Sequence, residues 1–372
     1  MIYIIEVGLT FVMGCLFSML VLPRISLVSF KLRLFDQVNA RKIHKARIPC
    51  LGGIAFFPCI TVVVSLAVVF HNLYVDGNLL TTELTNQILT LFSALFMIYL
   101  MGMMDDLIGM RYRSKFVIQI FCGSLLVISG LCVDNLFGLF GIYEIPSYIG
   151  IPFTVFIIVY ILNAINLIDG IDGLASGISI MAFLAFGCMF IFLGWWVYAF
   201  ISFAAFGVLI PFFYYNVFGN VRRGRKIFMG DTGSLTIGML LAVLAIRLSM
   251  SDPVKDSTYS NVIVIVFSFL LVPMLDVARV MIHRLRNGKS PFIPDKNHIH
   301  HKFIALGMSQ HQAMICIMSI ILIFVVINIC LIHCLSATVL LLLDVAVWTV
   351  MHCLITRKIR NSSRIDNIKK YI

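Results

Sequence analysis

Charged residues are scarce in this 372-residue chain, where Asp, Glu, Lys and Arg together make up 12%. Hydrophobic residues make up 61%, and the mean hydropathy is +1.03. A soluble domain usually carries about 25% charged and about 45–50% apolar residues. The shortage of charge therefore excludes an ordinary soluble globule and favours an integral membrane protein.

The sequence also lacks the usual cysteine motifs and a leader pattern. Its ten cysteines are scattered, mostly inside apolar runs, and no CxxC pair occurs. Neither a disulfide framework nor a cysteine-based zinc site is predicted from this distribution. Residues 1–22 have no basic start and no small-residue cleavage site, so we expect this apolar run to be a membrane span rather than a signal peptide.

Long apolar runs occupy most of the chain, and each is typical of a transmembrane helix. They predict an all-α, polytopic integral membrane protein with about 11 transmembrane helices. We expect one multi-spanning domain over residues 1–355 and a basic tail over 356–372. The expected spans are 2–22, 51–70, 87–104, 116–133, 149–165, 178–193, 196–215, 235–250, 260–278, 313–332 and 336–354.

Basic residues are distributed asymmetrically between these spans. Of the 28 Lys and Arg, 26 fall in alternate loops and the C-terminal tail, whereas the opposite loops hold only Lys255 and Arg247 lies at a helix end. The positive-inside rule therefore predicts that the basic loops are cytoplasmic, with the N-terminus outside and the C-terminus inside. The rule also accounts for most of the net charge of +11, so no nucleic-acid partner is indicated.

Acidic residues gather in the same basic loops, although membrane topology does not require them there. Asp105 and Asp106 lie at the end of the third expected span. Adjacent carboxylates disfavour double ionisation, which suits them to acid–base work or to binding a cation. The structural alternative is a pair solvated at a helix end.

The stretch NAINLIDGIDGLASG (163–177) interrupts two apolar runs with a repeating polar pattern. Asn163, Asn166, Asp169 and Asp172 recur every three residues, so consecutive members share a helix face. Glycines after each Asp let the backbone break and redirect the later side chains. A helix-loop-helix turn with Asn and Asp as caps is the alternative, but capping needs one such residue rather than four.

Asp231 stands in the small-residue motif MGDTGS, just after four basic residues. Small neighbours permit close approach of a phosphate-bound metal, and Mg²⁺ commonly takes one or two protein carboxylates. A plain turn before a helix beginning at Leu235 is the alternative.

The segment HIHH (298–301) presents three histidines in an Arg-rich loop. A zinc site is one interpretation, but no HExxH or third-ligand pattern accompanies it. A structural loop is another. Contact with phosphate or sugar is favoured by the neighbouring cations.

Together, carboxylates and amides for Mg²⁺ and basic side chains for phosphate oxygens suit phosphoryl transfer at a membrane face. At this point the chain resembles the polyprenyl-phosphate N-acetylhexosamine-1-phosphate transferases. The resemblance covers most of the chain, from IPCLGG (48–53) to HIHHKF (298–303), with five motifs in family order. Its sugar-transferring branch, the undecaprenyl-phosphate N-acetylglucosamine-1-phosphate transferases, is the most similar.

The resemblance implies a substrate pair and a reaction. A UDP-N-acetylhexosamine, first of all UDP-N-acetylglucosamine, binds at the cytoplasmic face of a bacterial inner membrane. Undecaprenyl phosphate enters from the inner leaflet and attacks the β-phosphorus, and UMP leaves.

The resemblance also implies roles for individual residues. Asp231 and Asn166 bind Mg²⁺, for which Mn²⁺ is a substitute, and Asp105, Asp106 and Asp231 are the catalytic carboxylates. Among the implied substrate-binding residues, Lys115 contacts the pyrophosphate and Phe228 stacks on uracil. Around the nucleotide lie Asn163, Asp169 and Asp172, and at the sugar phosphate lie His298, His300 and His301. A further motif of the family contains His44 and Arg47.

Two alternative functions stay open at this level. The phospho-N-acetylmuramoyl-pentapeptide transferase branch typically has an HHHFE-like last motif, from which PDKNHIHHKF (294–303) departs. An ion-coupled secondary transporter would place its carboxylates near the bilayer midplane, whereas here they lie at helix ends or loops. A homodimer remains open as well.

Overall fold

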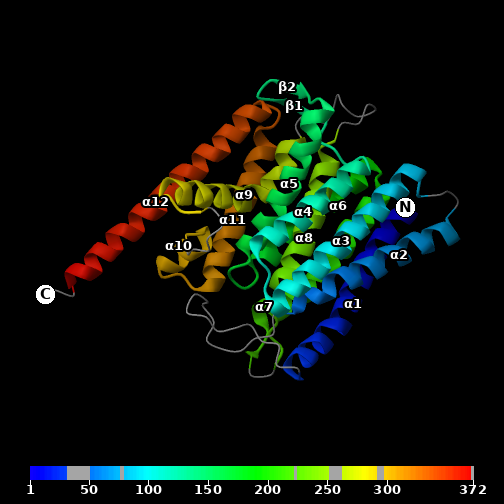
Figure 1. The fold of residues 1–372 in the computed structure, drawn as a ribbon, viewed down its shortest axis with the longest axis horizontal. Helices are drawn as coiled ribbons and strands as arrows, with labels where there is room; N and C mark the ends of the chain where they lie inside the picture. Colours follow the sequence, from blue (N-terminus) through cyan, green and yellow to red (C-terminus); the bar gives the residue numbers. More distant parts are fainter. Residues whose placement is uncertain (32–50, 76–78, 222–223, 251–261, 291–296, 370–372) are drawn as a thin grey trace.

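The computed structural model describes residues 1–31, 51–75, 79–221, 224–250, 262–290 and 297–369. Over these residues the chain is almost wholly helical (Figure 1). The elements are α1 (Ile2–Lys31), η1 (Gly52–Ala55), α2 (Phe56–Tyr74), α3 (Thr82–Ile108), α4 (Tyr112–Ile128), β1 (Asn135–Leu139), β2 (Ile142–Glu144), α5 (Ser147–Ile168), α6 (Leu174–Leu193), α7 (Trp196–Phe218), α8 (Gly230–Leu248), α9 (Val262–Arg286), α10 (Ile299–Ala305), α11 (Gln310–Leu331) and α12 (Ala337–Lys369).

The helical, polytopic architecture predicted from the apolar runs is confirmed. Within the described residues, ten helices are long and apolar enough to cross a membrane. The remaining expected span, 116–133, corresponds to α4, which has 17 residues and ends at Ile128. The prediction overran because Gly130 adopts a φ of 98° and stops the helix, although the apolar sequence continues.

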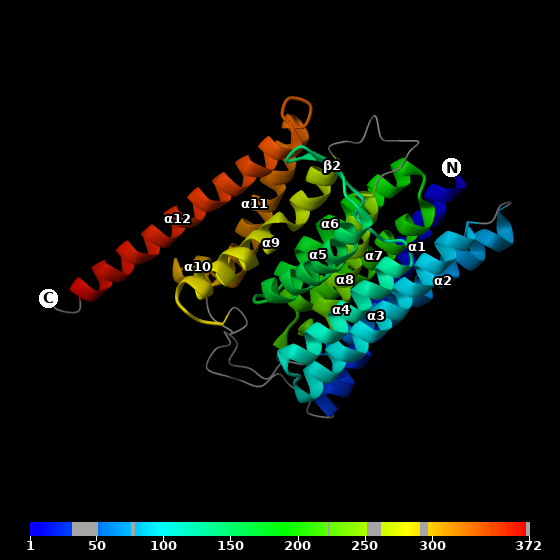
Figure 2. The same cartoon turned by 45° about the horizontal axis from the view of Figure 1, so that its top comes forward.

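Helix α8 is the centre of the bundle. Every residue from Thr232 to Ile246 is buried, as expected for a helix that is apolar on all sides. Helices α3, α5 and α6 pack around it, while α1 packs along α7. Figures 1 and 2 show α1, α2 and α3 at one edge of the molecule and α12 at the opposite edge.

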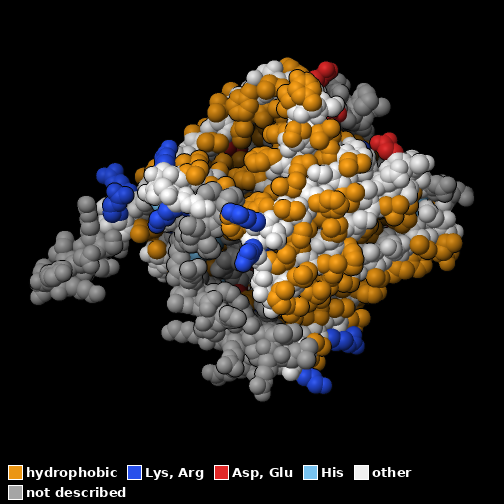
Figure 3. Space-filling view, viewed as in Figure 1, with side chains coloured by type: hydrophobic (Ala, Val, Ile, Leu, Met, Phe, Trp, Pro, Cys, Tyr) orange, Lys and Arg blue, Asp and Glu red, His pale blue; other side chains and the backbone are white. Residues whose placement is uncertain are grey.

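Charge is segregated on the surface as the loop pattern predicts. Figure 3 shows a broad apolar face with Lys and Arg toward its lower and left parts and acidic side chains at its upper and right margin. We call the end of the bundle where α3 ends and α8 begins the basic end. Its assignment to the cytoplasm stays a prediction.

Two small elements were not foreseen. Strands β1 and β2 form an antiparallel hairpin between α4 and α5, with Leu139 paired to Ile142. The two turn residues, Phe140 and Gly141, have φ values of 55° and 75°, as a type I′ turn requires. The HIHH segment, expected in a loop, enters the short helix α10.

Helices α3 and α8 approach each other at Gly102. A Cβ atom at this position would lie 2.5 Å from the Cα of Thr232, which is backbone and cannot swing away. We therefore expect Gly102→Ala to push the helices apart and lower the free energy of unfolding by about 1–3 kcal/mol. Gly8→Ala in α1 is the matched control, because nothing lies within 4 Å of its Cβ position. Thermal unfolding in detergent measures both, and equal melting temperatures would contradict this packing.

Candidate active site

The polar site at the basic end begins with a chain reversal between α3 and α4. Helix α3 ends at Ile108, and Gly109 follows with a φ of 74°. Met110 then donates its N–H to Asp105 Oδ1 at 2.6 Å. The reversal places Lys115, in the first turn of α4, where its ammonium contacts Asp105 Oδ2. Asp105 thus lies at the end of its helix, as predicted, and is ion-paired.

Asp106 holds the start of α8. Its Oδ1 accepts the N–H of Asp231 at 2.8 Å, and its Oδ2 accepts the N–H and hydroxyl of Thr232 at 2.9 and 2.6 Å. Helix N-termini carry unpaired N–H groups and a partial positive charge, so a carboxylate there is doubly favourable. Both oxygens of Asp106 are engaged in this way. The adjacent carboxylates predicted as one pair therefore make different contacts.

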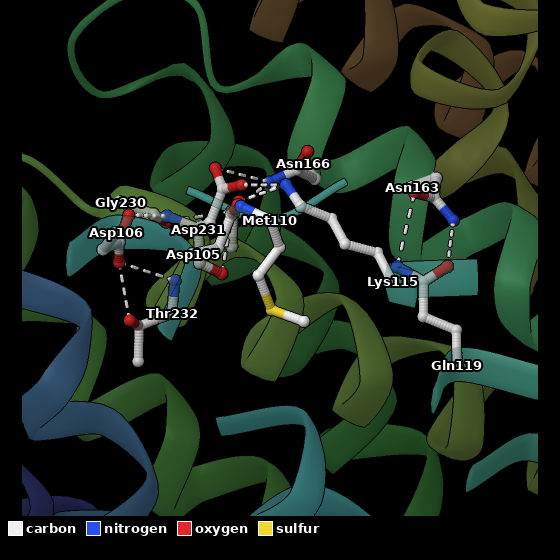
Figure 4. Close-up of polar contacts among 11 residues, drawn as sticks. Asp105, Asp106, Met110, Lys115, Gln119, Asn163, Asn166, Gly230, Asp231 and Thr232 are labelled. Atoms are coloured by element: carbon white, nitrogen blue, oxygen red, sulfur yellow. Dashed lines mark hydrogen bonds and ion pairs between the residues drawn. The ribbon is translucent and has the colours of Figure 1, made fainter. Parts of the chain in front are cut away.

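Asp231 lies at the meeting point of α3, α4, α5 and α8. Its Oδ2 is 2.9 Å from Lys115 Nζ, and its Oδ1 accepts a hydrogen bond of 3.1 Å from Asn166 Nδ2. Asn166 also donates to Ser234 Oγ at 2.9 Å. In Figure 4 the Lys115 ammonium and the Asn166 amide converge on this carboxylate. The Asp231 side chain keeps 34% of its surface exposed, so it is accessible to a ligand.

The expectation that α8 begins at Leu235 is wrong, because the helix begins at Gly230. The cause is the tertiary cap from Asp106, which accepts the N–H groups of Asp231 and Thr232 in the extra turn. Gly230 has a φ of 71°, which allows the chain to enter the helix sharply.

The two glycines that end the IPCLGG motif pack against this first turn. Gly52 and Gly53 donate their N–H groups to the carbonyls of Phe228 and Met229 at 3.0 and 2.9 Å. A Cβ on Gly53 would lie 2.2 Å from the Cα of Gly233, so only glycine allows this approach. Phe228 is half-buried beside the site.

The periodic Asn and Asp residues separate into different environments. Helix α5 ends at Ile168, and Gly173 with a φ of 79° precedes α6, so the predicted break is confirmed. Asp172 forms an ion pair of 2.6 Å with Lys226. Asn163 donates to Gln119 Oε1 at 2.7 Å and to the Val159 carbonyl. The bond to Gln119 therefore links α5 to α4, away from Asp231.

Asp169 lies in the loop after α5, among like charges. Burial raises its pKa to about 8, and repulsion from Asp231, Asp172 and Asp106 adds to the shift. The loop and helix ends bring five carboxylates into one electrostatic neighbourhood, with Lys115 and Lys226 as the ion-paired cations. The neighbourhood therefore carries an excess of negative charge that a divalent cation would balance.

The donor chemistry fits Mg²⁺ bound through few protein ligands. Among the residues that the structure describes, no three His, Cys, Asp or Glu side chains form a ready metal cage. Mg²⁺ does not need one, since it usually keeps water or substrate phosphate in most positions. Asp231 and Asn166 fit such a site, because the Asn166 bonds use its nitrogen and not its carbonyl oxygen.

The histidine segment lies against the loop of Asp169. A Cβ on Gly170 would be 2.1 Å from His300 Nε2, so the imidazole packs directly on the glycine. The rings of His298 and His300 are 5.8 Å apart, and those of His300 and His301 are 4.2 Å apart. Burial and the neighbouring histidines lower the pKa of His300 to about 3, so it is neutral. His44 and Arg47 fall outside the described residues.

Several residues at the site were missed by the sequence analysis. Thr232 and Ser234 had no signal beyond their place beside Asp231. Asp276 is buried in α9 and bonded to His298. The sequence did carry a signal for it, because an acidic residue inside an apolar run suggests a functional site.

Sequence comparisons relate the chain to known proteins. The family model of glycosyl transferase family 4 matches residues 88–249. A probable undecaprenyl-phosphate N-acetylglucosaminyl 1-phosphate transferase of Bacillus subtilis is 32% identical over 86% of this chain and 83% of its own length. Undecaprenyl-phosphate alpha-N-acetylglucosaminyl 1-phosphate transferases of Salmonella typhi and Escherichia coli are 29% and 27% identical, each over 78% of this chain and 74% of their own length.

The two neighbouring carboxylates should respond differently to neutralisation. Asp106→Asn places an amide nitrogen against N–H donors of α8, and we expect it to lower the free energy of unfolding by about 1–3 kcal/mol. Asp105→Asn loses the ion pair with Lys115, but it retains an oxygen for Met110 and removes a like charge beside Asp231, so we expect a smaller loss. Thermal unfolding in metal-free buffer compares them, and a greater loss for Asp105→Asn would refute the assigned cap.

Proposed function

From the premise that the chain belongs to glycosyl transferase family 4, we propose that it transfers N-acetylglucosamine-1-phosphate from UDP-N-acetylglucosamine to undecaprenyl phosphate. UMP is the second product, and the lipid-linked sugar starts a cell-surface glycan. The names of the relatives support the substrates. The observation that carries the chemistry is the convergence of Lys115 and Asn166 on Asp231, at the end of an apolar bundle.

The reaction exchanges one phosphorus–oxygen bond for another. An oxygen of undecaprenyl phosphate attacks the β-phosphorus of the donor, and the bond from that phosphorus to the bridging oxygen breaks. UMP leaves with the bridging oxygen. Since a phosphate monoester has a second pKa near 6, the attacking group is already largely ionised at pH 7 and direct displacement needs no strong base.

The residues of the site divide this work. Asp105 and Asp231 flank the reacting phosphates, and Lys115 lies between them to neutralise phosphate oxygens. Asp106 contributes by fixing the first turn of α8 under Asp231. Mg²⁺, held by Asp231 and Asn166, would neutralise charge on the diphosphate when bound.

The UDP-sugar donor binds around Asp105, Lys115 and Asp231. Phe228 stacks on uracil, and Asp169 and Asp172 line the nucleotide pocket. The three histidines of the 298–301 segment meet the sugar phosphate. Asn163 is better suited to holding α5 against α4, given its bonds to Gln119.

The enzyme is a multi-pass membrane protein, and we infer that it lies in the bacterial inner membrane with the basic end in the cytoplasm. The 26 basic residues of one set of loops support this orientation. A soluble UDP-sugar then reaches the carboxylates from the cytoplasm, while the lipid acceptor enters along the apolar helices.

A UMP-release assay tests the function. Purified protein, Mg²⁺ and undecaprenyl phosphate are combined with UDP-N-acetylglucosamine, UDP-N-acetylgalactosamine or UDP-N-acetylmuramoyl-pentapeptide. We expect the fastest release with UDP-N-acetylglucosamine and none without undecaprenyl phosphate. Absence of UMP with every donor would overturn the proposal.

In the same assay Asp231→Asn should abolish release, because the variant loses the metal-binding charge, with a drop on the order of 10³-fold or more. Arg113→Gln is the control, since this arginine is an exposed residue of the same end and its hydrogen bond goes to the neighbouring Tyr112. Near-normal turnover of Asp231→Asn, with Mg²⁺ dependence intact, would rule out the metal role.

A further inference from the structure

Asp276 is a carboxylate buried within a helix that is apolar enough to span a membrane. Its relative exposure is 0%, and it lies in the candidate span Ile263–Arg286. A charge in such a position is costly, so its partners must offset a large desolvation cost. No role has been given to it in the reaction above.

The partners of Asp276 come from the start of the histidine segment. Its Oδ2 lies 2.8 Å from His298 Nδ1. The N–H of Ile299 donates to its two oxygens at 3.1 and 3.2 Å. Arg279, one turn further along α9, is 3.1 Å from Oδ1 and also contacts the carbonyl of Asn297. One carboxylate and its arginine therefore hold three consecutive residues at the start of α10.

The bond to His298 selects one form of the imidazole. A carboxylate only accepts hydrogen bonds, so Nδ1 carries a proton and Nε2 is directed away from Asp276. The His298 ring is parallel to that of His300, with an interplanar angle of 2°. His300 in turn packs on Gly170, next to Asp169. The rings of His298 and His300 therefore connect Asp276 to the loop that holds Asp169.

Helix α12 also contacts α10, through the side chain of Lys302. Lys302 Nζ lies 2.9 Å from His352 Nδ1 and donates to Thr356 Oγ1 at 2.7 Å. Because the ammonium only donates, His352 Nδ1 accepts and its Nε2 carries the proton, facing Asp276 Oδ1 at 3.9 Å. Helices α9 and α12 therefore hold α10 through charged and polar contacts.

We propose that Asp276 is a positioning residue for sugar-phosphate transfer, whose carboxylate fixes the tautomer and ring orientation of His298 at the phosphate end of the donor. The proposal rests on the proposed function, since it assigns His298 to the donor. Asp276 itself does not touch substrate.

Asp276→Asn is the first test. The amide would turn its nitrogen or its oxygen toward His298, and the first case reverses the tautomer. We expect kcat for UMP release to fall on the order of 10–100-fold, by analogy with the loss of a carboxylate that orients a metal-bound histidine. The melting temperature should stay within a few degrees. Unchanged kcat would refute the proposal.

Asp344→Asn is the matched control. Asp344 is also a buried aspartate of a membrane-spanning helix, 2% exposed, but its carboxylate accepts from Asn328 in α11, away from the histidines. We expect this variant to retain kcat. An equal loss in both variants would mean that neutralising any buried aspartate slows the enzyme.

A double-mutant cycle separates positioning from a general structural role. If Asp276 acts through His298, the double variant Asp276→Asn with His298→Asn should be no slower than His298→Asn alone, within about 3-fold. Multiplication of the two single losses would contradict the proposal, because it would mean that the residues act independently.

Asp276→Glu decides the question if the asparagine variant does not fold. It keeps the charge opposite Arg279 but moves the carboxylate by one methylene, so kcat should fall while the melting temperature is retained. Loss of folding in both variants, or wild-type kcat in the glutamate variant, overturns the proposal. A wild-type enzyme that releases no UMP would instead refute the proposed function, and this inference with it.

Discussion

The arrangement of the site depends on one interaction, the capping of α8 by Asp106. Three hydrogen bonds of 2.6 to 2.9 Å tie the last turn of α3 to the first turn of α8. This capping is possible only because Gly102 and Gly53 let neighbouring backbones approach the start of α8. Once α8 is fixed, the position of Asp231 follows, and so do its contacts with Lys115 and Asn166. A membrane protein thus uses a helix terminus as the rigid base of a polar site.

Carboxylates outnumber their ion-paired cations at the site. Asp105, Asp106, Asp169, Asp172 and Asp231 lie near each other, and their mutual repulsion contributes to the raised pKa of Asp169. Lys115 and Lys226 balance part of this charge. In the proposed function, a divalent cation would offset the charge of the carboxylates, and Lys115 would meet the phosphates of the donor. Phosphoryl transfer depends mainly on such positioning and charge neutralisation.

The sequence predicted the features that depend on local pattern. Apolar runs located the spanning helices, and Gly170 and Gly173 marked the break after α5. The position of Asp105 at a helix end followed from where the apolar run stops. In each case the signal lies within a few neighbouring residues.

Features that depend on tertiary contact were missed. Asp106 and Asp231 are 125 residues apart, so no local pattern links the cap to the early start of α8. The separation of Asn163 from Asn166 was hidden for the same reason, because the partner of Asn163 is Gln119 in another helix. Asp276 was visible as an acidic residue in an apolar run, but its role required the fold to bring His298 beside it.

In the proposed function, the site binds the donor diphosphate together with a divalent cation. Calorimetric titration of the wild-type protein with UDP-N-acetylglucosamine, in the presence of Mg²⁺ or of a chelator, tests it most directly. We expect binding at least about 10-fold tighter with Mg²⁺, a difference of about 1.4 kcal/mol. Equal affinity in the two conditions would contradict it.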